Sequence, residues 1–356
     1  MDKEVLDLYT DYLISSFGLT TATGLSALLG GAISHDRVSR FLSKSDGTSA
    51  KLWQLIKPLA RQVQSDDGVL IIDDSIEAKP YTDESELICW HWDHTVNRSV
   101  KGINLMTCLY YSQEVALPVA FELVTKPDWV TDKKTGKLKR AQRQTKNELY
   151  RQMLATCLAN QLPFRYVLND IWFASAENMV YVKEQLGKDY VMPLKENRKV
   201  SLAVPNTPNR QFTPVSEVSL EANTLLTVWL EDVDFPLLLV KQVFTNKDGS
   251  EGIAYLVTSD TTLTAEQILT LYQKRWKVEE YHKSLKSNLC FPKSPTKTVR
   301  TQSNHLFACL VAFAKMERLR MHTRLNHFAM KAQLYQAALA SAFQQLQLLQ
   351  AKCSAA

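Results

Sequence analysis

The stretch "GVLIIDDS", residues 68–75, does most to define the fold. Four consecutive apolar residues follow a glycine and precede two aspartates. An apolar run of this kind is typical of a strand that is buried on both faces of a sheet. A second such run, "FRYVLND" at residues 164–170, also ends in an acid. Because open α/β sheets carry reactive groups at strand ends, Asp73, Asp74 and Asp170 become candidate site residues.

The segments around these two runs alternate between strand and helix patterns. Strand-like runs occupy residues 103–112, 115–124 and 189–195, and helix-like runs occupy residues 146–160 and 177–187. This alternation predicts an α/β core. A further β-rich region, residues 200–257, either interrupts the core as an inserted antiparallel sheet or continues it. From residue 265 onward the chain is expected to be helical.

Composition limits the class of protein. The chain has 356 residues, of which 45% are hydrophobic and 22% charged, as in a globular protein of two or three structural units. No stretch reaches about 18 consecutive apolar residues, so we expect no membrane partner. The N-terminus, "MDKEVLDLYT", differs from a secretory signal. None of the six cysteines forms a C-x-x-C pair, which favours free thiols in a reducing cytoplasm over a zinc site or disulfides.

Residues 1–65 read as a helical region. Gly30 and Gly31 end one short helix, and Ser34 is a good N-cap for the next. Basic residues share one face of that second helix. Two short helices joined by a tight turn fit a helix-turn-helix module that binds DNA, but they fit a plain helical bundle equally well. The candidate DNA contacts are Arg37, Arg40 and Lys44.

Positive charge concentrates between residues 126 and 151. The chain as a whole is only mildly basic, with a net charge of +5, which is weak support for nucleic-acid binding. The local run is either a nucleic-acid contact or a solvated loop and helix face. Its candidate DNA-binding residues are Lys139, Arg140, Arg143 and Lys146.

The stretch "LYQKRWKVEEYHKSLK", residues 271–286, carries two glutamates within a basic segment. If the stretch is one helix, each residue turns by about 100°, and Tyr272, Arg275, Glu279 and Lys286 fall within roughly 60° of arc. Glu280 lies about 100° away from Glu279 and is the poorer candidate. These four groups would lie at the border of the core-facing side of the helix. A solvated surface helix would instead carry its charged groups away from that side.

Three carboxylates, from Asp73, Asp170 and Glu279, would suit Mg²⁺ or Mn²⁺ rather than zinc. A pair of such ions would support in-line attack on phosphorus. Arg275 and Lys286 would bind phosphates nearby, and Lys283 is a further candidate on the same segment. Tyr272 would donate a hydrogen bond to a phosphate or stack on a base. The alternative for each strand-end aspartate is a simple turn or N-cap acid.

At these residues the sequence resembles bacterial insertion-sequence DDE transposases that bear the YREK signature, in the insertion-sequence-four-like group. Tyr272, Arg275, Glu279 and Lys286 match the four letters of that signature at its spacing. The segments "IIDDS" and "VLND" resemble those that carry the first and second aspartates of the family. The pattern assigns Asp73 as the first ligand, while Asp74 stays open as an alternative.

The resemblance implies an RNase H-like mixed-sheet core with a β-strand insertion. We therefore expect a DNA-binding module at 1–65, the first part of the core at 66–199, the insertion at 200–257, core completion with the glutamate helix at 258–295, and C-terminal helices suited to dimerisation at 296–356. It further implies nicking at transposon ends, strand transfer into target DNA, and a homodimer on paired ends in the bacterial cytoplasm, associated with the nucleoid. In relatives that make hairpin intermediates an aromatic residue holds a flipped base. Trp229 is the candidate here, the alternative being an ordinary core residue.

Two other functions remain open at this point. One is a DNA-binding protein derived from such a transposase that has lost catalysis, against which the intact acidic triad argues. The other is a structure-specific nuclease that cleaves without strand transfer.

Overall fold

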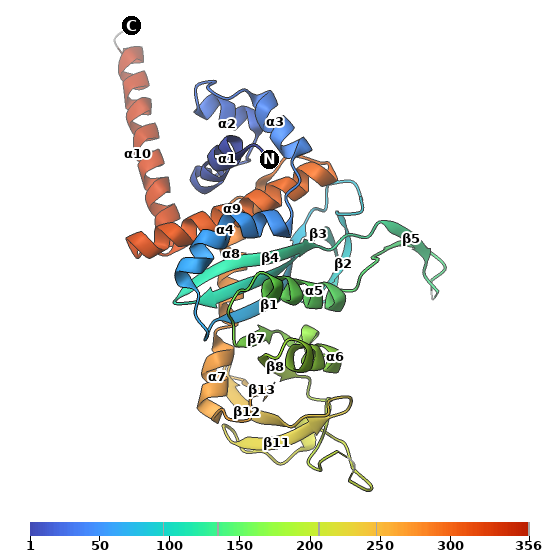
Figure 1. Ribbon diagram of the computed structural model, residues 1–356. Helices are drawn as coiled ribbons and strands as arrows, with labels where there is room; N and C mark the ends of the chain where they lie inside the picture. The colour runs from blue at the N-terminus through green and yellow to red at the C-terminus, as the bar shows by residue number, and fades with distance from the viewer. Residues whose placement is uncertain (95, 134, 206, 247, 355–356) are drawn as a thin grey trace. The chain divides into compact units, whose positions relative to one another are not determined.

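The computed structural model describes residues 1–94, 96–133, 135–205, 207–246 and 248–354 (Figure 1). The chain divides into two compact units. The helical unit consists of Met1–Leu59, Glu77–Gly102 and Glu280–Ala356, and the sheet unit consists of Ala60–Ile76 and Ile103–Glu279. Among the described residues, no helix combines the length and the apolar character needed to cross a membrane.

A large mixed sheet is the centre of the sheet unit. Strand β1 (Val69–Ala78) pairs in parallel with β7 (Tyr166–Asn169), which pairs in parallel with β8 (Asp189–Leu194). On the other side of β1 lies β3 (Arg98–Ser112), which pairs with the antiparallel β4 (Val115–Leu123). The expected α/β fold with an RNase H-like mixed sheet is therefore confirmed.

The β-rich region continues this sheet. Strand β13 (Glu251–Thr258) pairs antiparallel with β8 and is followed in the sheet by β12 (Leu237–Thr245) and β11 (Leu225–Leu230). The short strands β9 (Lys199–Ser201) and β10 (Thr213–Pro214) complete this edge. A 3₁₀ turn (Val215–Glu217) follows β10. Backbone hydrogen bonds therefore join the inserted strands directly to the parallel core strands.

Helices of the sheet unit carry their apolar residues toward the sheet. Helix α5 (Lys146–Ala159) starts with a capping box between Thr145 and Glu148 and packs on β4 (Figure 1). A 3₁₀ turn (Ile171–Phe173) follows β7 and leads to α6 (Ala176–Val180), which runs on into a π-helical turn (Tyr181–Gln185). Helix α7 (Ala265–Gln273) follows β13. A separate two-stranded sheet is formed by β5 (Asp128–Thr131) and β6 (Leu138–Ala141).

The helical unit is built around α9 (Val299–Thr323), most of which is buried. Helices α1 (Lys3–Ser15) and α3 (His35–Lys44) pack on it, and α2 (Ala22–Leu28) packs on α3 (Figure 1). The unit also contains most of α4 (Ser49–Val63) and α8 (Trp276–Asn288), strand β2 (Cys89–Asp93) paired with the start of β3, a 3₁₀ turn (Phe291–Lys293), and α10 (His327–Ser354).

The tight turn expected near the N-terminus is present. Gly30 and Gly31 both have positive φ, which glycine adopts without strain, and they follow the end of α2. Ser34 caps α3 by accepting a hydrogen bond from the backbone of Arg37. The inward-facing residues of α3 are buried, as predicted: Val38, Phe41 and Leu42.

The prediction of one continuous helix over residues 271–286 is wrong. Helix α7 ends at Gln273 and α8 begins at Trp276, with Lys274 and Arg275 in the turn between them. In this turn the backbone N–H groups of Lys274, Arg275, Lys277 and Val278 each bond to the carbonyl three residues earlier, which is a tighter winding than an α-helix. The uniform 100° step therefore does not relate Tyr272 to Glu279, and only their contacts show where each side chain lies.

Candidate active site

Two acids end neighbouring parallel strands. Residues 69–72 of β1 and residues 166–169 of β7 are buried, and Ile72 lies directly opposite Asn169. Asp73 and Asp170 are the next residues on the two strands. The register therefore brings both acids to one end of adjacent strands, as the strand patterns predicted.

Glu279 comes to the same place from the start of α8. One carboxylate oxygen of Asp73 and one of Glu279 lie within 4.8 Å of each other. The side chain of Asp73 is 13% exposed and that of Glu279 is 42% exposed. A buried and a partly exposed carboxylate thus face each other at the edge of the sheet.

The electrostatic state of these acids is unusual. Burial raises the pKa of Asp73 well above its usual value, and the nearby carboxylates of Asp170, Asp74 and Glu279 raise it further. Burial also raises the pKa of Asp170, although backbone hydrogen bonds oppose the rise. The cluster is therefore short of positive charge. Carboxylate oxygens gathered in this way suit a hard divalent cation, which would relieve both burial and repulsion.

Arg275 places a positive charge beside two of these acids. Its Nη1 atom lies 3.3 Å from Oε1 of Glu279 and 3.9 Å from Oδ2 of Asp73. The sequence led us to expect this guanidinium on phosphate, with the carboxylates left to a metal. In this structure it contacts two of the carboxylates directly, so it partly offsets their charge.

Asp74 has a different environment from its neighbour. Its Oδ2 atom accepts hydrogen bonds of 2.7 Å from the ammonium of Lys146 and of 2.7 Å from the amide of Asn104. Lys146, a candidate DNA contact, is therefore engaged with a half-buried acid. The backbone N–H of Asp74 in turn donates to Oδ1 of Asp73 at 2.8 Å. Asp74 is satisfied by protein groups, and Asp73 is not.

Asp170 and the residue before it are held by a small network. Asp170 accepts a hydrogen bond from the backbone of Trp172 and so also caps the 3₁₀ turn, as the simpler interpretation of a strand-end acid proposed. The buried Asn169 accepts from the Tyr150 hydroxyl at 2.9 Å and donates to the Asp170 carbonyl at 2.7 Å. The Tyr272 hydroxyl donates to the Asn169 carbonyl at 3.4 Å.

Sequence reasoning missed Asn104, Tyr150 and Asn169. Only Asn169 gave a local signal, since it is a polar residue at the end of a buried apolar run. Asn104 and Tyr150 lie inside segments whose patterns predict ordinary strand and helix, and no spacing rule links them to the acids.

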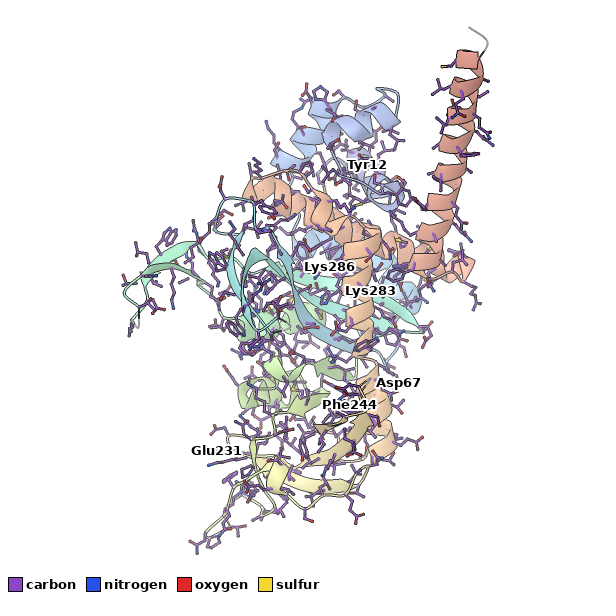
Figure 2. The ribbon with its side chains drawn as sticks, turned by 180° about the vertical axis from the view of Figure 1, so that it is seen from behind. Tyr12, Asp67, Glu231, Phe244, Lys283 and Lys286 are labelled. Carbon is purple, nitrogen blue, oxygen red and sulfur yellow. The ribbon has the colours of Figure 1, made fainter. Side chains whose placement is uncertain are left out.

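The remaining candidates on α8 belong to the helical unit. Lys283 and Lys286 lie on this helix (Figure 2). Lys283 is exposed, with its ammonium 5.2 Å from the ring centroid of Phe328. Burial raises the pKa of Glu77, and the positive charge of Lys286 acts against that rise.

The basic residues of α3 differ in their availability. Arg37 forms ion pairs with Asp2 at 2.8 Å and Glu4 at 2.6 Å. Arg40 and Lys44 are exposed and line a shallow pocket together with Phe41 and Arg37. The face predicted to contact DNA is thus partly neutralised by acids of α1 and the residue before it.

Trp229 lies on β11 opposite Ser201 of β9. Its neighbours Val228 and Leu230 are buried, while Trp229 points to the other face and is half-buried. The ring therefore lies outside the fully buried core. Its expected role with a flipped base stays a prediction.

Comparison with known proteins agrees with this geometry. The family described as "DDE superfamily endonuclease" matches residues 2–214, and the family described as "Transposase DDE domain" matches residues 121–314. No curated protein is significantly similar to the chain. The solved structures that match include Kluyveromyces polysporus Argonaute with a guide RNA, at 10% identity and a TM-score of 0.21, with 82% of this chain and 32% of that chain covered. So low a TM-score carries no argument. Each family match spans more than half of the chain, which therefore belongs to the DDE superfamily of endonucleases and contains a DDE transposase domain.

Proposed function

We propose that this protein is an insertion-sequence transposase of the group with the Tyr-Arg-Glu-Lys signature. It cuts DNA at the ends of a mobile element and joins those ends to target DNA. The observation that carries the proposal is the gathering of acids around Asp73 in the sheet unit. Asp73 and Asp170 end adjacent strands, Glu279 lies within 4.8 Å of Asp73, and mutual repulsion contributes to the raised pKa of Asp73.

Asp73, Asp170 and Glu279 would hold Mg²⁺ or Mn²⁺, and we propose that two ions bind. Bound at such a site, these ions activate an attacking oxygen and stabilise a leaving oxygen on phosphorus. The environment of Asp74 favours Asp73 as the ligand. Asp74 already accepts two hydrogen bonds of 2.7 Å from Lys146 and Asn104, whereas Asp73 is short of donors.

Other residues of the sheet unit position this cluster. The Tyr150 hydroxyl donates to the side chain of Asn169, and the Tyr272 hydroxyl donates to its backbone carbonyl. The Asn169 amide in turn donates to the carbonyl of Asp170. Arg275 stands beside Asp73 and Glu279, where it would also attract a phosphate of the DNA. The signature residue Tyr272 thus helps to position Asp170 through Asn169, and Arg275 partly offsets the negative charge of Asp73 and Glu279.

The DNA partner comprises the element's inverted-repeat ends and the target duplex. Lys283, Lys286, Arg40 and Lys44 are proposed phosphate contacts on the helical unit, and Trp229 is the proposed stacking residue for a flipped base. In this proposal the five segments inferred from the sequence keep their roles, and the protein works in a bacterial cytoplasm on the nucleoid.

A plasmid-nicking assay tests the enzymatic part. The wild type should nick supercoiled DNA in Mg²⁺ and be inactive in EDTA, while Glu279→Gln and Asp170→Asn should lose about 10³-fold or more in rate. Glu280→Gln is the matched control, since Glu280 is the exposed neighbour of Glu279 and should retain activity. Wild-type protein that binds DNA but never nicks it would identify a silent DNA-binding descendant. Nicking of element ends without joined products would identify a nuclease.

The proposal includes a homodimer, and α10 offers the surface for it. Its residues from 332 to 353 are exposed, and apolar side chains recur along it at alternating spacings of four and three: Tyr335, Leu339, Ala342, Leu346, Leu349 and Cys353. This is the repeat of a two-stranded coiled coil. Between residues 329 and 354 the only charged residues are Lys331 and Lys352, so little charge repulsion opposes a second copy of the same helix.

Sedimentation of matched variants tests the dimer. Leu339→Lys with Leu346→Lys would place charges in the repeat and should give a monomer. Leu334→Lys with Leu348→Lys changes two leucines that are equally exposed but lie outside the repeat, and should leave the dimer intact. A wild type that stays monomeric at micromolar concentration, or a dimer insensitive to the first pair, contradicts this part of the proposal.

A further inference from the structure

The positive charge of this protein is concentrated in one short segment. Residues 126–146 contain eight lysines and arginines and two aspartates, a net charge of +6, whereas the whole chain carries +5. One of the eight, Lys134, lies outside the described residues. The remainder of the chain is thus close to neutral, so this segment dominates the attraction of the sheet unit for a polyanion.

The segment contains a hairpin that the sequence patterns did not predict. Strands β5 and β6 form a two-stranded antiparallel sheet of their own, with Trp129 directly opposite Arg140 and Val130 opposite Lys139. Gly136 takes a positive φ of 68° in the connecting turn. In Figure 1 the hairpin extends away from α5 and β4.

Large apolar side chains of the hairpin are exposed to an unusual degree. Trp129 is 55% exposed and Leu138 is 69% exposed. A lone two-stranded sheet is marginally stable in water. This one relies on contacts among its own charged groups and ring. The guanidinium of Arg140 lies 4.5 Å from the Trp129 ring centroid, Arg143 forms two bonds of 2.9 and 3.0 Å to Asp128, and Lys139 pairs with Asp132.

Both acids of the segment therefore form ion pairs with basic residues of the same segment. Arg143 neutralises Asp128, and Lys139 neutralises Asp132. Of the other basic residues, Lys133 and Lys137 are exposed at the tip, Arg140 lies against the Trp129 ring, and Lys146 pairs with Asp74. Exposing these apolar side chains to water on an ordered hairpin with a cationic tip costs free energy unless the hairpin binds a partner.

We propose that the β5–β6 hairpin is a DNA-binding ribbon that enters the major groove of duplex DNA. This inference rests on the proposed function, since it takes element-end or target DNA as the partner. The major groove is about 12 Å wide and admits a two-stranded ribbon, whose strands lie about 4.8 Å apart. Lys133 and Lys137 reach phosphates on its rims, and the exposed Trp129 and Leu138 lie toward base edges and sugars.

Salt-dependent binding tests the ribbon. We would measure the affinity of the full-length protein for a duplex oligonucleotide by fluorescence anisotropy, in EDTA, over a range of salt concentrations. Each lost phosphate contact should reduce the slope of log K against log salt by about 0.9. The double variant Lys133→Gln, Lys137→Gln should therefore lose about 2 from the slope.

A matched variant removes the same charge elsewhere. Lys199→Gln, Lys297→Gln changes two exposed lysines outside both the hairpin and residues 1–65, and should change the slope by less than about 1. Unfolding temperatures of both variants should equal that of the wild type. Equal slopes for the two double variants, or a wild type that prefers an acidic protein surface to duplex DNA, would overturn the ribbon.

Plasmid nicking at low salt separates this inference from the proposed function. The hairpin variant retains the acid cluster and should nick once bound. If the wild type nicks but the hairpin variant binds like the wild type, only the ribbon fails. If the wild type binds DNA through the hairpin yet never nicks, the catalytic proposal fails and the ribbon stands.

Discussion

Two buried aspartates of the sheet unit, Asp73 and Asp260, have opposite electrostatic environments. Asp260 follows β13 and is 7% exposed. It accepts hydrogen bonds from Arg165 at 3.1 Å, from the Tyr166 hydroxyl at 2.7 Å, and from the backbone and hydroxyl of Thr262 at 3.0 and 2.6 Å. Burial alone would raise its pKa, but these bonds lower the pKa to about 2.

Among the described residues, Asp73 has no such set of donors. It accepts the backbone bond from Asp74, has Arg275 at 3.9 Å, and faces other carboxylates. Its pKa is raised where that of Asp260 is lowered. The difference teaches that burial is not what marks the candidate site. Asp260 is a structural acid satisfied by the protein, whereas Asp73 is the acid for which we propose a cation from outside as the partner.

The largest expected effect is on catalysis at Asp73. Asp73→Asn keeps the shape of the side chain and removes a metal ligand, so nicking should fall by about 10³-fold or more. Asp74→Asn is the matched variant and should cost less, at most about 100-fold, because Asp74 acts through Lys146 and Asn104. Initial rates on supercoiled plasmid measure both. A larger loss for Asp74→Asn would reverse the assignment of the ligand.

The next effect is on stability at Asp260. Asp260→Asn removes the charge that its four bonds stabilise, and the lowering of its pKa from 3.8 to about 2 corresponds to about 2 kcal/mol of folding free energy. Urea unfolding at pH 7 measures the loss. At a temperature where the variant is folded, nicking should match the wild type. A strong loss of nicking in a folded variant would place Asp260 in the function instead.

A smaller effect concerns the pH dependence of stability without metal. A carboxyl whose pKa is raised by folding stabilises the fold below its unfolded value near 3.8, and this stability is lost as pH rises through the folded pKa. Between pH 5 and 8 in EDTA, Asp73→Asn should therefore show a flatter decline in unfolding free energy than the wild type.

The same titration distinguishes the two aspartates. The stability contributed by Asp260 is present above its unfolded value and is lost only as pH falls through about 2. Asp260→Asn should thus lower the whole curve between pH 5 and 8 without changing its slope. Parallel curves for the wild type and Asp73→Asn would show that Asp73 is not under repulsion.

The strands that carry the acids could be predicted because they are buried on both faces. Continuous apolar runs define β1 and β7, and each ends at an acid, so Asp73, Asp74 and Asp170 followed from pattern as candidates, and only the family resemblance favoured Asp73 over Asp74. The break between α7 and α8 could not be predicted, since neither Lys274 nor Arg275 disrupts a helix by its own preference.

Contacts between residues far apart in the chain could not be predicted from the sequence either. Lys146 reaches Asp74 across 72 positions, and its place in a basic run favoured DNA instead. The β5–β6 hairpin lacks buried strands and an alternating pattern, because its strands have four residues each and most of their side chains are exposed or half-buried. Its order depends on cross-strand contacts such as that of Arg140 with Trp129, which no local pattern reveals.

The most direct measurement is Mn²⁺ binding, followed by electron paramagnetic resonance of the free ion, for the wild type, Asp73→Asn and Asp260→Asn. The wild type and Asp260→Asn should bind Mn²⁺ with the same stoichiometry and similar affinity, and Asp73→Asn should lose at least one ion. Binding that Asp73→Asn leaves unchanged would contradict the claim that Asp73, with Asp170 and Glu279, forms the metal site of this transposase domain.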